Sequence, residues 1–160
     1  MAASIWAGAC RVTIWWKNRA AVNKPTPLRP HVETDSQAVG SFRRVFVHDL
    51  ILPCAIGVHA HEHHAPQRVR INVDLMVREQ ERALQDRIEN VVSYEHLVDG
   101  VRALTTDGHI NLVETLAERI AELCLSDGRV AQVRVRVEKL DIYAEAASVG
   151  VEIEREHGNS

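Results

Sequence analysis

The stretch RVRINVDLMVR, residues 68–78, alternates apolar and polar side chains along almost its whole length. A period of two residues is that of a β-strand with one buried face and one face in water. Met76 alone interrupts the polar side. The stretch therefore predicts a half-buried strand, with a core-facing side formed by Val69, Ile71, Val73, Leu75 and Val77.

Three further segments predict strands that would pair with this one. Residues 133–138 (VRVRVE) and 149–154 (VGVEIE) each place apolar residues at every second position, with charged residues mainly between them. Residues 43–51 predict a fourth strand with a weaker alternation. Each of the four segments would then turn one apolar face toward a common core.

Two amphipathic helices are predicted between the strand pairs. The first begins at Ser93, a favourable N-cap, continues through Leu97 and Val101, and ends by Gly108. The second, residues 111–128 (NLVETLAERIAELCLSDG), ends at Gly128. Its apolar stripe consists of Leu112, Leu116, Ile120 and Leu123.

The element order β-β-α-α-β-β predicts an α+β fold in which two helices cover one face of a four-stranded antiparallel sheet. At 160 residues the chain is long enough for one domain with its own core. We place this domain at residues 42–156. Its uncovered, charged sheet face would lie in water or against a symmetry mate.

Residues 1–41 differ in composition and predict an N-terminal extension. Residues 1–32 contain five Lys or Arg, no acidic residue and all three tryptophans, which is also typical of a transit peptide. Residues 25–41 are rich in Pro, Ser and other polar residues and are typical of a linker. An unstructured extension or an over-long translation start is the preferred interpretation, and a secretory signal is disfavoured.

Composition limits the partners and the compartment. A net charge of −3 without a basic stripe argues against nucleic acid, and no apolar run is long enough to span a membrane. Cys10, Cys54 and Cys124 are odd in number and have no CxxC spacing, which favours reduced thiols. We therefore expect a cytoplasmic protein.

The segment GVHAHEHHAPQ, residues 57–67, contains four histidines and one glutamate and suggests a metal site by composition alone. If the segment were extended, His59, His61 and His63 would share one face. It follows a predicted strand, however, and is more typical of a loop, so we expect no metal here.

Lys139 is the only lysine of the predicted domain, whose other Lys or Arg residues are all arginines. It continues the odd-numbered parity of Val135 and Val137, so its side chain should turn toward the apolar side. Burial favours the neutral form of an amine, which can then act as a base. The alternative is a strand-end lysine that extends to solvent.

Glu114 and Tyr94 each have a structural and a functional interpretation. Asn111-x-x-Glu114 has the form of a capping box, but a carboxylate in the first turn of a helix can also accept hydrogen bonds from a ligand. Tyr94 shares a helical stripe with Leu97 and Val101, which is compatible with a core residue.

Five segments resemble the dihydroneopterin aldolase family of folate biosynthesis, in the same order and across residues 43–155. They are IGVHAHEHHAPQ (56–67), VVSYEHL (91–97), NLVETLAERIA (111–121), VRVEKL (135–140) and SVGVEIER (148–155). The resemblance implies a T-fold whose subunits assemble edge to edge into rings, generally as an octamer, with the active site between subunits. It also implies a metal-free, cofactor-free enzyme that cleaves 7,8-dihydroneopterin into 6-hydroxymethyl-7,8-dihydropterin and glycolaldehyde.

The same resemblance implies the site residues. The family's catalytic glutamate, tyrosine and lysine correspond to Glu62, Tyr94 and Lys139. Its pterin-anchoring glutamate corresponds to Glu114, and we expect Val92 and Val113 to contact the pterin as well. By this interpretation Glu62 is the working residue of the histidine-rich segment, and the histidines need not bind anything.

Two alternatives remain at this point. Leu140 stands where the family commonly has proline, and Leu140 with Tyr143 is similar to dihydroneopterin triphosphate epimerase, which inverts C2′ through the same intermediate. The closing SVGVEIER is closer to the aldolases. The less favoured alternative is a zinc-dependent T-fold pterin enzyme that would use His59 and His61.

Overall fold

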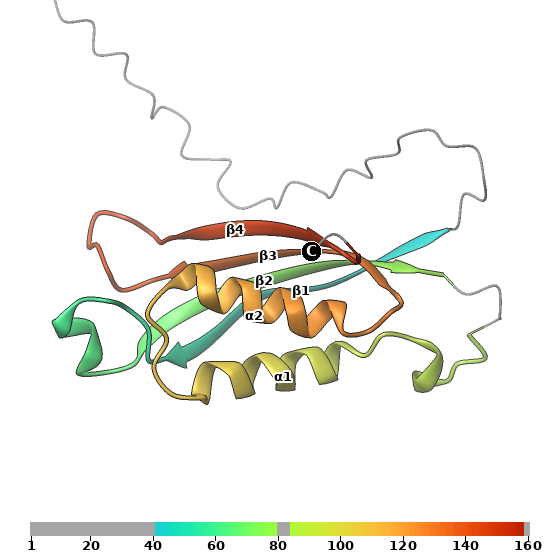
Figure 1. Cartoon of the computed structure of the whole chain (residues 1–160), viewed down its shortest axis with the longest axis horizontal. Helices are drawn as coiled ribbons and strands as arrows, with labels where there is room; N and C mark the ends of the chain where they lie inside the picture. Colours follow the sequence, from blue (N-terminus) through green and yellow to red (C-terminus); the bar gives the residue numbers. More distant parts are fainter. Residues whose placement is uncertain (1–40, 80–83, 159–160) are drawn as a thin grey trace, which may run out of the picture. The chain divides into compact units, whose positions relative to one another are not determined.

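The computed structural model describes residues 41–79 and 84–158, so the expectations for residues 1–40, including Cys10, lie outside it. Four strands and two α-helices make up the described region (Figure 1). Two short 3-10 helices, η1 and η2, lie between them. The elements are β1 (Phe42–Cys54), η1 (Ala60–His63), β2 (Gln67–Arg78), η2 (Ile88–Asn90), α1 (Tyr94–Thr106), α2 (Val113–Leu125), β3 (Val130–Lys139) and β4 (Val149–Glu156).

The four strands form one antiparallel sheet in the order β1-β2-β3-β4, which confirms the predicted fold class. β2 and β3 are the central strands although both helices separate them in the sequence. Their register places Val69 opposite Lys139 and Val73 opposite Val135. This register brings the start of β2 beside the end of β3.

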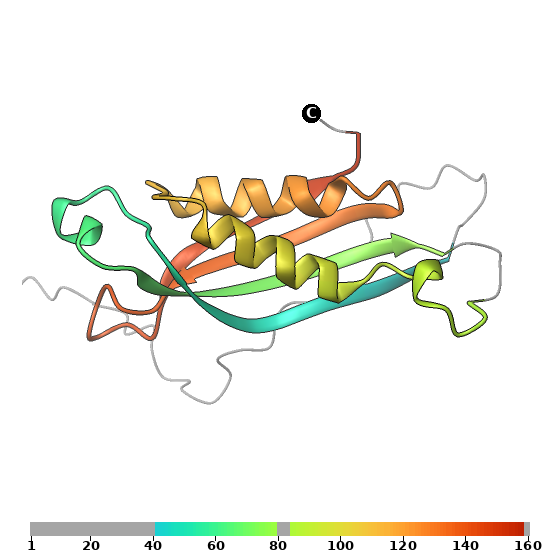
Figure 2. The same ribbon diagram turned by 90° about the horizontal axis from the view of Figure 1, so that it is seen from below.

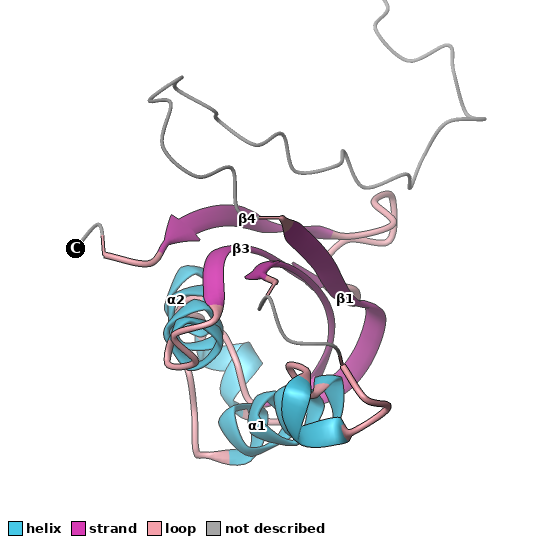
Figure 3. Cartoon of the chain, turned by 90° about the vertical axis from the view of Figure 1, so that its right-hand side faces the viewer, coloured by secondary structure: helices cyan, strands magenta, loops and turns pink. Residues whose placement is uncertain are grey.

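Both helices pack against the same face of the sheet, as predicted. α1 contacts β1, whereas α2 contacts β3 and β4. The two helices lie side by side and run in opposite directions, because a short segment links the end of α1 to the start of α2 (Figure 2). The sheet curves around this helical layer (Figure 3). No helix of the described region is long and apolar enough to cross a membrane.

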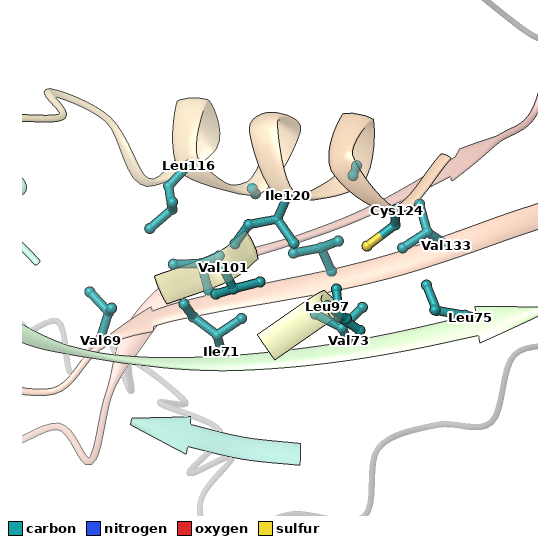
Figure 4. Packing of buried hydrophobic residues seen from close by; sticks show 14 of the residues in the cluster. Val69, Ile71, Val73, Leu75, Leu97, Val101, Leu116, Ile120, Cys124 and Val133 are labelled. Atoms are coloured by element: carbon teal, nitrogen blue, oxygen red, sulfur yellow. The ribbon is translucent and has the colours of Figure 1, made fainter. Parts of the chain in front are cut away.

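The core lies between the sheet and the helices (Figure 4). The predicted stripe of β2 is buried throughout, with exposed fractions of 8% or less, and Val133, Val135 and Val137 of β3 are fully buried. From the helices, Leu116 and Ile120 are also fully buried. Truncating either of these two side chains to alanine should destabilise the fold by about 2–5 kcal/mol.

β1 is longer than the predicted segment 43–51. The sheet register shifts between Val47 and Leu50, where Asp49 has a φ of +54° and its amide donates to Asn72. Because of this irregularity, Val45 and Val47 pack on the core before the shift, and Leu50 and Leu52 pack on it afterwards. The change from odd to even positions explains why the alternation in the sequence is weak.

α2 is shorter than predicted and begins differently. Its N-cap is Leu112, which is 48% exposed and has no capping side-chain bond, so the Asn111–Glu114 capping box is not formed. The helix ends at Leu125, before Gly128. Of the predicted apolar stripe, Leu123 packs against the core and only Leu112 does not. Three small residues of the helix are buried as well, namely Ala117, Ala121 and Cys124.

Candidate active site

Lys139 is the last residue of β3, and its side chain lies on the helix-covered face of the sheet, as its parity predicted. Its side chain is 13% exposed, and Nζ donates a 2.6 Å hydrogen bond to Oε1 of Glu62. The ammonium group is thus directed at a buried carboxylate, and the alternative of a lysine extended to solvent is wrong. The parity of β3 and the hydrogen bond to Glu62 together fix the position of the Lys139 side chain.

The chain after Lys139 is bound to the start of β2. The Leu140 amide donates a 3.1 Å hydrogen bond to the Arg68 carbonyl, and the Arg68 amide donates to the Asp141 carboxylate at 3.0 Å. Proline in place of Leu140 could not form the first of these bonds, because proline has no N–H. Leu140 therefore extends the pairing of β2 and β3 one residue past the lysine.

Glu62 lies in the 3-10 turn η1 and is only 5% exposed. Besides Lys139, its carboxylate accepts hydrogen bonds from Gln67 Nε2 at 2.9 Å and from the His59 amide at 3.1 Å. The hydrogen bonds from Lys139 and Gln67 lower the pKa of Glu62 to about 2, more than burial raises it. Glu62 is therefore an ionised, buried acceptor at neutral pH.

Gly57 allows this carboxylate to approach the backbone. Its φ is +137°, and a Cβ built on it would lie 2.2 Å from Cδ of Glu62. The Gly57 carbonyl accepts a 2.7 Å hydrogen bond from His109 Nε2. The His109 ring stacks on the His63 ring, with 3.9 Å between the ring centroids. The segment before α2 thus supports the turn that carries Glu62.

The histidine-rich segment does not form the extended strand that a zinc-binding HxH pair would need. Residues 60–63 form a 3-10 turn, so alternate residues do not share a face. Among the described side chains of residues 41–79 and 84–158, which do not include that of His61, no three His, Cys, Asp or Glu residues are grouped so that they could hold a metal ion. This turn therefore does not provide the strand on which the zinc-enzyme alternative would place His59 and His61.

Cys54 at the end of β1 is fully buried close to Lys139. Burial raises the pKa of its thiol, and the positive charge of Lys139 offsets only part of that effect. Cys124 is also a buried free thiol, and burial raises its pKa to about 12. Neither thiol is a suitable nucleophile.

Glu114 and Val113 lie in the first turn of α2, at the same end of the sheet as Glu62. The amide of Gly57 donates a 2.9 Å hydrogen bond to the Ile110 carbonyl, which attaches the segment before α2 to the segment after β1. Glu114 is exposed and forms no hydrogen bond or ion pair with another residue of the described region. Its carboxylate is available to a ligand.

Tyr94 is the first residue of α1, and Val92 comes two residues before it. The start of α1 lies at the opposite end of the fold from the start of α2 (Figures 1 and 2). Val92 and Ser93 line a depression of about 590 Å3 together with Leu123 and Cys124 from the last turn of α2. A helix of 13 residues is about 20 Å long, so one chain does not bring Tyr94 to Lys139. Tyr94 is 65% exposed, and its interpretation as a core residue is wrong.

The structure adds two residues near Glu62 to which the sequence analysis gave no role. Gln67 donates to Glu62 and to the Ile56 carbonyl, and His109 supports the turn. Gln67 has the same parity as Val69 and Ile71, which could have placed it on the site's side of the sheet. His109 has no comparable signal, because its contacts are made across the fold.

Comparison with known proteins gives one consistent family. The family profile described as dihydroneopterin aldolase (FolB) matches residues 45–154. Dihydroneopterin aldolase of Escherichia coli K12 is 31% identical over 111 residues, which cover 69% of this chain and 91% of that protein. The relative from Streptomyces coelicolor is 35% identical over 85 residues, 53% of this chain and 71% of that protein.

Solved structures agree with the sequence relatives. The E. coli dihydroneopterin aldolase in complex with neopterin has a TM-score of 0.66 and 30% identity, covering 71% of this chain and 98% of that one. The enzyme from Burkholderia thailandensis bound to guanine has a TM-score of 0.63 and 35% identity, covering 72% and 91%. The T-fold expectation and the resemblance are both confirmed, and the chain belongs to the dihydroneopterin aldolase family.

Proposed function

We propose that this protein is an aldehyde-lyase that cleaves 7,8-dihydroneopterin into 6-hydroxymethyl-7,8-dihydropterin and glycolaldehyde in folate biosynthesis. The observation that carries the proposal is the buried hydrogen bond between Lys139 and Glu62, in a chain of this family. The E. coli relative is in complex with neopterin, which supports a pterin as the substrate. The reaction needs neither a metal nor a cofactor for the following reasons.

The substrate itself can accept the electrons that the cleavage releases. Loss of the proton from the 2′-hydroxyl turns that oxygen into the carbonyl of glycolaldehyde as the C1′–C2′ bond breaks. The electron pair of this bond moves into the conjugated C6=N5 imine and gives an enamine. A proton delivered to C1′ then restores the imine. The protein must supply proton transfer and positioning.

Lys139 is the proposed base, acting through an ordered water. Once its ammonium group has released a proton to solvent water, the neutral amine can take the 2′-hydroxyl proton by way of the ordered water. Glu62 holds the amine at 2.6 Å and already accepts three hydrogen bonds from Lys139, Gln67 and the His59 amide. A carboxylate has about four acceptor positions, so one remains to orient the water.

Tyr94 is the proposed proton relay to C1′, and it would come from a neighbouring subunit. Its exposed position at the far end of the fold supports this assignment, because a second copy is needed to bring it beside Lys139. Val92, two residues earlier, would come from the same neighbour. The proposed assembly is a ring in which each site uses both ends of the T-fold, with two stacked rings forming an octamer.

Glu114 is the proposed anchor for the pterin ring. Its free carboxylate can accept paired hydrogen bonds from the 2-amino and N3–H groups, which is a charge-assisted contact selective for this ring. Val113 in the same turn would contact the ring.

The proposed catalytic domain spans residues 42–156. The free thiols of Cys54 and Cys124 support a reducing compartment such as the cytoplasm.

A product assay tests this function directly. Metal-stripped protein is offered 7,8-dihydroneopterin and its triphosphate separately, and glycolaldehyde release is resolved from inversion at C2′. We expect cleavage of the unphosphorylated substrate, since the relatives reported above are aldolases. Inversion of the triphosphate with little cleavage would assign the protein as an epimerase. Activity that returns only with added zinc would refute the metal-free mechanism.

A further inference from the structure

Gln67 makes two hydrogen bonds that determine the orientation of its amide. Nε2 donates to the Ile56 carbonyl at 2.6 Å and to Oε1 of Glu62 at 2.9 Å. Both partners can only accept, because one is a carbonyl and the other an ionised carboxylate. The nitrogen of the amide must therefore face Glu62, and the oxygen must point elsewhere.

The amide oxygen of Gln67 is buried and accepts no hydrogen bond from any residue of the described region. Burying an acceptor without a donor is unfavourable because the atom loses its hydrogen bonds to water, so such an atom is rarely left unsatisfied. It belongs to a side chain bonded to Glu62, on the strand face that also carries Lys139. The donor that this oxygen needs would therefore lie within the proposed active site.

We propose that Gln67 is a positioning residue of this site. Its N–H groups hold the Glu62 carboxylate against Lys139, and its oxygen accepts a hydrogen bond from an O–H group, either a water or a side-chain hydroxyl of the substrate. This proposal rests on the proposed function for the identity of the substrate. The contact to Glu62 stands on the geometry alone.

The test compares Gln67→Met with Gln132→Met. Methionine keeps the length of the side chain but can neither donate nor accept as an amide does. Gln132 is a matched control, since it also donates to a carboxylate of the same sheet, Glu154, but lies near the other end of β3. We expect kcat on 7,8-dihydroneopterin to fall about tenfold to a hundredfold in Gln67→Met and to stay within twofold in Gln132→Met.

Titration of the Glu62 carboxyl group by 13C NMR, without substrate, distinguishes a positioning role of Gln67 from a merely structural one. Removing the Gln67 donor should raise the pKa of Glu62 from its present value of about 2, and Gln132→Met should leave it unchanged. An unchanged Glu62 titration, or a kcat within twofold of the parent protein, overturns the proposal.

If Gln67→Met does not fold, Gln67→Glu replaces it. Its carboxylate repels Glu62, so activity should recover as acid protonates one of the two groups.

Binding measurements distinguish the two donors. The probes are 7,8-dihydroneopterin and 6-methyl-7,8-dihydropterin, which lacks side-chain hydroxyls. If the donor is a substrate hydroxyl, Gln67→Met weakens binding of the first probe only. If it is a water, both probes bind equally well to the variant and only kcat falls. Should the parent protein release no glycolaldehyde, the proposed function fails, whereas the substrate-free titration still decides whether Gln67 controls Glu62.

Discussion

Lys139 and Glu62 are 77 residues apart in the sequence, and a 2.6 Å hydrogen bond joins Nζ of the lysine to Oε1 of the glutamate. The pair connects the end of β3 to the 3-10 turn η1. Glu62 is buried and ionised, and its other donors are Gln67 and the His59 amide.

Replacing Lys139 by alanine should reduce kcat at least a hundredfold, because it removes the proposed general base. Pterin binding should be largely retained, since binding is assigned to Glu114 and the ring pocket. Steady-state kinetics with 7,8-dihydroneopterin and equilibrium binding of the hydroxymethyl product measure the two effects. A variant that keeps most of its turnover would show that another group takes the hydroxyl proton.

Replacing Glu114 by alanine should weaken binding first. Losing charge-assisted hydrogen bonds worth about 1.5–3 kcal/mol raises Kd about tenfold to a hundredfold. Glu122→Ala is the matched control, since Glu122 is an exposed glutamate two turns later on the same helix. Equal affinity in both variants would exclude Glu114 as the pterin anchor.

Two inactive variants should restore activity when they are mixed. Tyr94→Phe and Lys139→Ala each damage one end of the fold, and a site built between subunits can combine an intact Tyr94 with an intact Lys139. After the subunits are unfolded together and reassembled, random mixing should leave about a quarter of the sites complete. Failure to regain turnover, with assembly verified by light scattering, would contradict a shared site.

Replacing Gly57 by alanine should disrupt the turn that carries Glu62. The added Cβ would lie 2.2 Å from the Glu62 carboxyl carbon, and a φ of +137° costs a residue other than glycine about 1–3 kcal/mol. Gly128→Ala is the control, since nothing lies within 4 Å of its Cβ position and its φ is not positive. We expect a lower thermal midpoint and lost turnover only in Gly57→Ala.

Stability should decline in acid because of Glu62. Its pKa is lowered from an ordinary value of 4.5 to about 2 in the folded chain, so folding favours the ionised form. The resulting stabilisation is complete above pH 4.5, decreases as pH falls through this range, and is lost below about pH 2. Urea unfolding of the parent protein and Glu62→Gln should therefore show a difference in free energy of unfolding that narrows from pH 5 to pH 2.

The strands and their buried faces could be predicted from the sequence because alternation records which side of a strand is buried. The stripe from Val69 to Val77 is buried as predicted, and Lys139 lies on the face that its parity indicated. β1 was harder to predict, since the irregularity after Val47 moves the apolar residues from odd to even positions. Local sequence also suggested a capping box at Asn111 that α2 does not form.

The sequence by itself determined the fold class, the family resemblance and the candidate residues, because these depend on local periodicity and on motifs read in order. Only the tertiary structure decided which candidates meet. It joins Lys139 to Glu62 and leaves Tyr94, at the start of α1, at the other end of the fold. Gln67 acquired a role only through its bonds to Glu62 and Ile56. Contacts between distant segments depend on strand register and helix direction, which no single segment contains.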